Sequence, residues 1–125
     1  MGPLTNEAPG TTTYKEDNGC SRTRARREVM GYLVGVLTIH LHLPACSSLK
    51  EKRRRLKPLL ARLHREFNVS SAEIGLQDSW QEAILNCAMV GNENAYLQSA
   101  LSTVAAWVKG NWPDGMIVDQ RIEIV

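Results

Sequence analysis

Residues 42–70, "HLPACSSLKEKRRRLKPLLARLHREFNVS", decide the fold because they carry the clearest helical pattern in the chain. Pro44 ends the extended segment that precedes this helical pattern. Ser48 and Glu51 have the spacing of a capping box, so we expect a helix that begins after Ser48. At about 100° per residue, one helix face collects the apolar side chains Leu49, Leu56, Leu59, Leu60, Leu63 and Phe67. Pro58 lies on the opposite side, where it removes one backbone hydrogen bond and should bend the helix outward.

Alternating apolar residues on both sides of this helix predict strands. Residues 32–43 form the first strand, with its inward face made of Leu33, Leu37, Ile39, Leu41 and Leu43. Residues 69–75 and 80–91 form the second and third, and the third buries Ala83, Leu85, Cys87 and Met89. Residues 92–109 predict a second helix, whose inward side chains are Leu97, Ala100, Leu101, Val104, Trp107 and Val108. Residues 116–125 predict a last strand.

The predicted order is β-α-β-β-α-β. Each βαβ half should cross over with right-handed connectivity. Both helices then cover one face of a four-stranded antiparallel sheet, which is the α+β ferredoxin-like βαββαβ sandwich.

Length and composition restrict the remaining choices. The 125 residues fit one folded domain. Residues 1–29 carry Gly, Pro, Thr and charges without apolar periodicity, so they predict a disordered tail with a basic end, before a domain over 30–125. Part of the tail could precede the native start, because Met30 would open the domain cleanly. The three cysteines lack metal or redox spacing, which indicates a reduced, cytoplasmic protein without a cofactor.

Four blocks carry a resemblance: "VGVLTIHLHLP", "SLKEKRRRLKPLLARL", "FNVSSAEIG" and "QDSWQEAILNCAMV". Over roughly residues 31–125 the chain resembles the YlxP-like family of small bacterial proteins of unknown function. The resemblance implies a ferredoxin-like fold in a bacterial or plastid-lineage cytosol. Genes of that family often neighbour those of transcription, ribosome-maturation and translation-initiation factors, which implies a link to RNA. It implies no catalytic residue.

Charge is distributed unevenly along the chain. Residues 47–67 hold eight Lys/Arg against two Asp/Glu, a net charge of +6, whereas residues 68–125 hold two against seven, a net charge of −5. The predicted phosphate-binding residues on the first helix are Lys50, Lys52, Arg53, Arg54, Lys57 and Arg65. Of these, Lys52 and Arg53 should flank the leucine stripe with extended side chains. Arg55 and Arg62 should point to the other flank.

The alternative is that these cations form an ordinary solvated helix face. Two features favour an anionic partner instead. Acidic residues at i,i+4 are scarce, so the cations repel one another, and the early cations lie where the helix dipole disfavours positive charge. RNA phosphate, ribosomal or otherwise structured, would offset that cost.

The other sheet face predicts an oligomer interface. Its apolar residues are Val34, Val36, Ile84, Ala88 and Val90, and self-association into a homodimer or larger assembly is the simplest way to cover them. Base stacking of the kind an RRM uses needs aromatics on the first and third strands, and the central positions here have none.

Three smaller groups carry weaker signals. His40 and His42 share a strand face but lack a third metal ligand, so no metal site is expected. Cys46 precedes a helix start without a nearby base, which is typical of an inert thiol. In the loop between the second and third strands, Asp78 should cap the turn and Trp80 should anchor the loop. The alternative hypothesis is functional: this polar loop, which also contains Gln77 and Gln81, forms a contact surface for RNA or for another protein.

No phosphate loop, nucleophile–base pair or paired catalytic carboxylates are recognisable, so an enzyme has little support. The leading hypothesis is a non-enzymatic RNA- or ribosome-associated accessory protein. The alternative is a small homo-oligomeric interaction or ligand-sensing module without a nucleic-acid role.

Overall fold

The computed structural model describes residues 31–125, so the tail predicted for residues 1–29 and its boundary at residue 30 lie outside the described residues. This part of the chain contains β1 (Leu33–His42), α2 (Leu49–Glu66), β2 (Ser70–Gly75), β3 (Glu82–Gly91), α3 (Asn94–Asn111) and β4 (Met116–Ile124). Every element predicted there is present, and its ends differ from the predicted ones by at most two residues.

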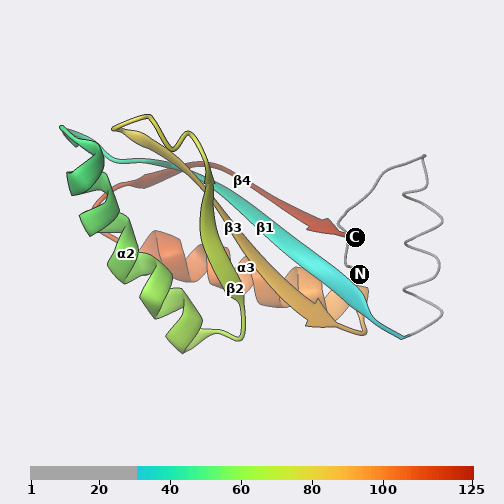
Figure 1. The fold of residues 1–125 in the computed structure, drawn as a ribbon. Coiled ribbons are helices and arrows are strands. Elements are labelled where there is room, and N and C mark those ends of the chain that lie inside the picture. Colours follow the sequence, from blue (N-terminus) through green and yellow to red (C-terminus); the bar gives the residue numbers. More distant parts are fainter. Residues whose placement is uncertain (1–30) are drawn as a thin grey trace, which may run out of the picture. The chain divides into compact units, whose positions relative to one another are not determined.

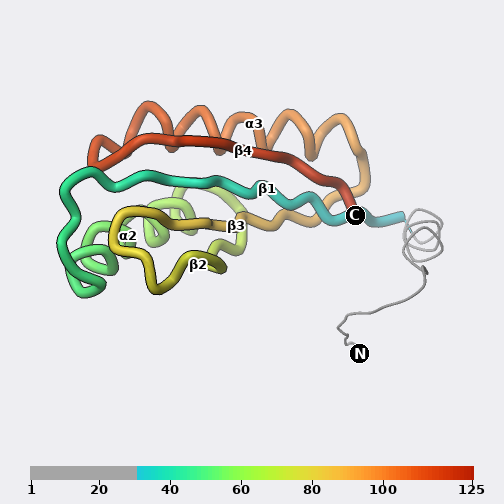
Figure 2. The backbone as a smooth tube through the Cα atoms, turned by 90° about the horizontal axis from the view of Figure 1, so that it is seen from above, coloured from blue at the N-terminus to red at the C-terminus, as the bar shows by residue number. Residues whose placement is uncertain are grey.

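The four strands form one sheet in the order β2-β3-β1-β4 (Figures 1 and 2). β1 pairs with β4 in antiparallel register, and β2 pairs likewise with β3. β1 and β3 run antiparallel, because Thr38 bonds to Asn86 and, just beyond the two strands, the Leu43 amide donates to the Gln81 carbonyl. The order βαββαβ with this strand arrangement confirms the ferredoxin-like sandwich.

The core lies between the sheet and the two helices. On β1, Leu37, Ile39 and Leu41 are 0% exposed, and on β3, Ala83 and Leu85 are too. The residues between them on each strand are half-buried on the opposite face. The predicted inward faces of both strands are therefore confirmed, and they follow from the two-residue period of an extended chain.

α2 begins as the capping pattern predicted. The Ser48 hydroxyl accepts a hydrogen bond from the Glu51 amide at 3.0 Å. The Glu51 carboxylate accepts from the backbone N–H of Ser47, one residue earlier than in the usual capping box. Leu56, Leu59 and Leu63 are buried, whereas Pro58 is exposed on the far side.

α3 lies close against β1. A Cβ added at Gly35 would come within 2.8 Å of the Leu101 side chain, so a glycine at this position lets the helix approach. The two helices also meet directly, because the ring of Trp107 lies edge-on to Phe67 with centroids 5.6 Å apart. Leu97, Leu101, Val104, Ala105 and Val108 form the buried side of α3.

Candidate functional site

Five of the six cations predicted to hold phosphate lie exposed on α2. They are Lys50, Arg53, Arg54, Lys57 and Arg65. Within residues 31–125, none of them forms an ion pair with a carboxylate. We call these five residues the basic face.

Lys52 is the exception, and its predicted role in binding phosphate is wrong. Its side chain is 1% exposed. The ammonium donates hydrogen bonds of 2.7 Å to the carbonyl oxygens of Leu76 and Ser79. It also forms a 2.9 Å ion pair with Glu73. A lysine has three donor protons, and here three internal oxygens surround them, so Lys52 cannot reach an external anion.

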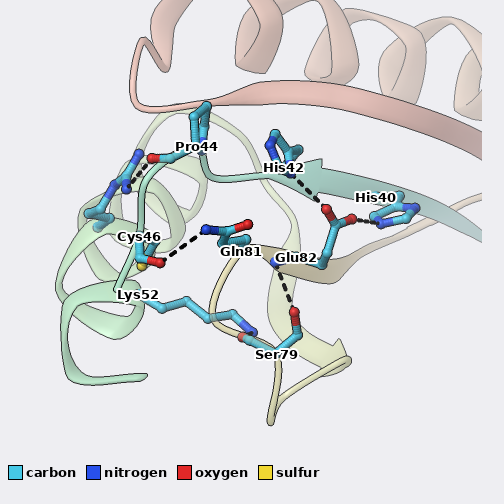
Figure 3. Close-up of polar contacts among 9 residues, drawn as sticks. His40, His42, Pro44, Cys46, Lys52, Ser79, Gln81 and Glu82 are labelled. Carbon is cyan, nitrogen blue, oxygen red and sulfur yellow. Dashed lines mark hydrogen bonds and ion pairs between the residues drawn. The ribbon is translucent and has the colours of Figure 1, made fainter. Parts of the chain in front are cut away.

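Two of the three partners of Lys52, the carbonyls of Leu76 and Ser79, belong to the loop 76–81, which joins β2 to β3, and Glu73 lies on β2. Figure 3 shows the Lys52 side chain reaching Ser79 from α2. Leu76 adopts a left-handed backbone, with φ of 56°, at a cost of about 1–2 kcal/mol. The same loop is tied to the segment before α2, because Gln81 donates to the Cys46 carbonyl at 3.5 Å. We call this segment the braced loop.

Two expectations for the braced loop need correction. Trp80 does not anchor it, because the indole is 52% exposed. The anchor is Lys52, which lies outside the loop. The turn is capped by Ser79, whose hydroxyl accepts from the Glu82 amide at 3.2 Å, rather than by Asp78.

The braced loop and the basic face are neighbours. A hollow of about 340 Å³ separates them, lined by Leu49, Lys52 and Arg53 of α2 and by Glu73, Gln77 and Asp78 of β2 and the loop. Leu76 is 44% exposed on the same loop. The braced loop therefore carries an exposed tryptophan and an exposed leucine, and Arg53 is the residue of the basic face that lines the hollow next to it.

Arg55 and Arg62 lie on the other flank of α2, as predicted, and serve the fold. Arg55 donates to the carbonyls of Pro44, at 3.3 Å, and of Asp114. Arg62 donates to the carbonyl of Asn111 at 3.1 Å and lies 4.8 Å above the Trp107 ring. Arg62 thus joins α2 to the end of α3, and Arg55 joins α2 to the loops before α2 and before β4, so neither guanidinium belongs to the basic face.

The five residues predicted for an oligomer interface do face away from the helices. Val34, Val36, Ile84 and Ala88 are half-buried, and Val90 is 70% exposed. Their register places three charged β4 residues on the same face: Glu123 opposite Val36, Arg121 opposite Thr38, and Asp119 opposite His40. The face is therefore an apolar strip beside a charged edge.

His40 and His42 meet a carboxylate on this face (Figure 3). Nε2 of His40 lies 2.5 Å from one oxygen of Glu82, and Nδ1 of His42 lies 2.7 Å from the other. Each imidazole donates one N–H to the shared carboxylate. Among the described residues, no group of three or more His, Cys, Asp or Glu side chains has a geometry that could hold a metal ion.

We expect the Glu82 bridge to stabilise the fold in a pH-dependent way. The hydrogen bonds from His42 and then His40 hold the pKa of the Glu82 carboxyl below its ordinary value of 4.5. A lowered folded pKa adds stability above the ordinary pKa, and that stability is lost as the pH falls through the folded pKa. In urea unfolding, Glu82→Gln should therefore cost more free energy at pH 7 than at pH 3.

Glu123→Gln is the matched control. It removes an exposed carboxylate from the same sheet face and leaves both histidine contacts of Glu82 intact. Its effect on unfolding should be small at both pH values. A cost of Glu82→Gln that stays constant from pH 7 to pH 3 would contradict the role of the bridge.

The two described cysteines are unsuited to nucleophilic chemistry. Cys46 is 1% exposed, and its Sγ lies 3.5 Å from the Ser48 carbonyl, as an inert thiol would. Burial raises the pKa of the Cys87 thiol to about 11, so the thiolate is scarce at neutral pH.

Neither α2 nor α3, the helices of the described part, is long and apolar enough to cross a membrane.

Over 61 residues the chain is 43% identical to the uncharacterized protein YlxP of Bacillus subtilis (strain 168). The aligned segment spans 49% of this chain and 66% of that relative, just under two thirds of its length. A family model described as a protein of unknown function (DUF503) matches residues 34–122. These similarities confirm the YlxP-like resemblance, and the chain belongs to the DUF503 family of proteins of unknown function.

Proposed function

We propose that this protein is a non-enzymatic, cytoplasmic RNA- or ribosome-associated accessory protein, which holds the phosphate backbone through the basic face of α2. The observation that supports this most is the exposure of five cations on one helix with no carboxylate paired to any of them in the described part of the chain.

Two physical effects make such a face costly without a partner. Like charges three or four residues apart on a helix repel, as Lys50 and Arg54 do. Lys50 and Arg53 also lie in the first turns of α2, where the helix dipole disfavours positive charge. Phosphate contacts relieve both effects and release condensed counterions. The arginines add bidentate recognition of phosphate oxygens.

A second candidate is a homo-oligomeric module that associates through the open sheet face. It is favoured by the apolar strip of Val34, Val36, Ile84, Ala88 and Val90. The β4 charges Asp119, Arg121 and Glu123 alternate in sign beside it, which suits pairing with a second copy. Salt separates the two candidates, because phosphate binding weakens steeply with salt and an apolar interface does not.

The first test changes Arg54 and Lys57 to Gln together. RNA binding should weaken uniformly across sequences, and each lost phosphate contact should reduce the salt slope by about 0.7–0.9. The fold should survive, because both side chains are exposed and the buried leucines are untouched. The measurement is a filter-binding titration against ribosomal RNA at several salt concentrations.

The matched control removes the same charge elsewhere, from Lys109 on α3 and Arg121 on β4, both exposed. This control should keep most of the affinity and the slope. If both double variants bind alike, or if the wild type binds no RNA at low salt, the basic face is a solvated surface. A dimer in sedimentation would then favour the second candidate.

A further inference from the structure

We infer that the braced loop is a subsite for an unpaired base, so the protein prefers single-stranded RNA to duplex RNA. This inference rests on the proposed binding of phosphate by the basic face. It assigns a separate role to residues 76–81, with Trp80 as the stacking side chain.

The loop is held in place before any ligand arrives. Lys52 is withdrawn from solvent to bind the carbonyls of Leu76 and Ser79, two positions in the same loop. Leu76 keeps a left-handed backbone that leucine disfavours, so the surrounding bonds must hold it there. A preformed loop loses little conformational entropy on binding, which favours affinity.

This rigid loop displays apolar surface instead of burying it. Trp80 is 52% exposed and Leu76 is 44% exposed. Since the loop is braced by a lysine, neither side chain is needed as its anchor. An exposed aromatic side chain on such a loop can stack on the face of any base, whatever its sequence.

The charges on this surface favour different positions for the phosphate and the base of a nucleotide. The braced loop contains no cation, and its exposed Asp78 repels phosphate. Arg53 stands across the hollow from Gln77 and Asp78. A strand whose phosphates follow the basic face therefore has its bases, rather than its backbone, next to the loop. The Gln77 amide offers both a donor and an acceptor to a base edge.

Duplex RNA does not fit this arrangement. Its bases are stacked and paired, and proteins recognise it by shape and by 2′-hydroxyl and phosphate contacts. Only a single strand, loop or bulge presents a base face to Trp80. The occupant of this surface is thus single-stranded RNA, with phosphates on α2.

The test compares Trp80→Ala with the wild-type full chain, using a uridine 12-mer and a duplex of equal length. The single strand should bind the variant about 5- to 150-fold more weakly, which is the range expected for one lost stacking contact. The salt slope and the duplex affinity should stay unchanged. Trp80→Phe should recover most of the single-strand affinity, and Tyr96→Ala, which removes a 59% exposed aromatic from α3, should have no effect.

Three results would overturn the inference. If Trp80→Ala binds the single strand like the wild type while the Arg54/Lys57 variant loses binding, phosphate binding stands and the stacking subsite fails. An equal loss on single strand and duplex would show that Trp80 supports the surface without selecting an unpaired base. No binding of either RNA by the wild type at low salt would remove both proposals.

Discussion

Lys52→Met should reduce the free energy of unfolding by about 3 kcal/mol, the lower end of the range for breaking one side of a buried ion pair. Methionine fills nearly the same space, so the loss reports the missing charge and hydrogen bonds rather than a cavity. The Glu73 side chain is 18% exposed, which limits the cost, although its Oε2, the atom paired with Lys52, is buried and would lose its partner. Urea unfolding of the two proteins measures the difference.

Two further variants make this result specific. Lys57→Met changes an exposed lysine of the same helix and should alter stability by only about 0.5 kcal/mol. Adding Glu73→Gln to Lys52→Met should restore part of the loss, since no unpaired carboxylate then remains. Amide exchange in residues 76–81 should also rise in Lys52→Met. If Lys52→Met costs no more than Lys57→Met, the lysine does not brace the loop.

Gly115→Ala should also be strongly destabilising, by about 1–3 kcal/mol or more. A Cβ at this position would lie 2.3 Å from the carbonyl oxygen of His42 and 2.9 Å from the Trp112 ring. The first contact is with backbone, so no side-chain rotation relieves it. The start of β4 or the end of β1 would have to move. The thermal midpoint of unfolding is the measurement.

Gly110→Ala provides a control of opposite sign. No atom lies within 4 Å of a Cβ added there, and the residue is in α3. Alanine favours a helix over glycine by up to about 1 kcal/mol, so this variant should be equally stable or more stable. Equal effects of the two substitutions would show that the close approach at Gly115 is relieved cheaply.

The order of the strands and helices, and the side of each that is buried, were predictable because both depend on patterns within a few consecutive residues. Alternation along 33–43 and 82–90 marks the buried sides of β1 and β3, and Ser48 with Glu51 marks the start of α2. Such signals act through the period of each element and the capping of its own backbone. They require no knowledge of what lies across the core.

The contacts by which Lys52 holds the braced loop were not predicted, although the sequence contains a signal for them. Lys52 lies four, seven and eleven residues before Leu56, Leu59 and Leu63, which places it within the leucine stripe of the helix. The sequence predicts its place at the flank of that stripe, with an extended side chain that carries the ammonium out to phosphate. A lysine aligned with the buried positions of a helix indicates either an extended side chain or an internal partner, and only the fold shows which.

By itself, the sequence determined the succession of strands and helices, most of the residues that form the core and the cluster of cations on α2. Only the tertiary structure decided the chemical environment of individual polar side chains. The Leu76 and Ser79 carbonyls that hold Lys52 lie 24 and 27 residues away, and Glu82 lies 42 and 40 residues from His40 and His42. Apolar burial depends on which face of an element is inward, a local property. A buried amine or a shared carboxylate depends on specific atoms that chain folding brings within about 3 Å, which local periodicity does not encode.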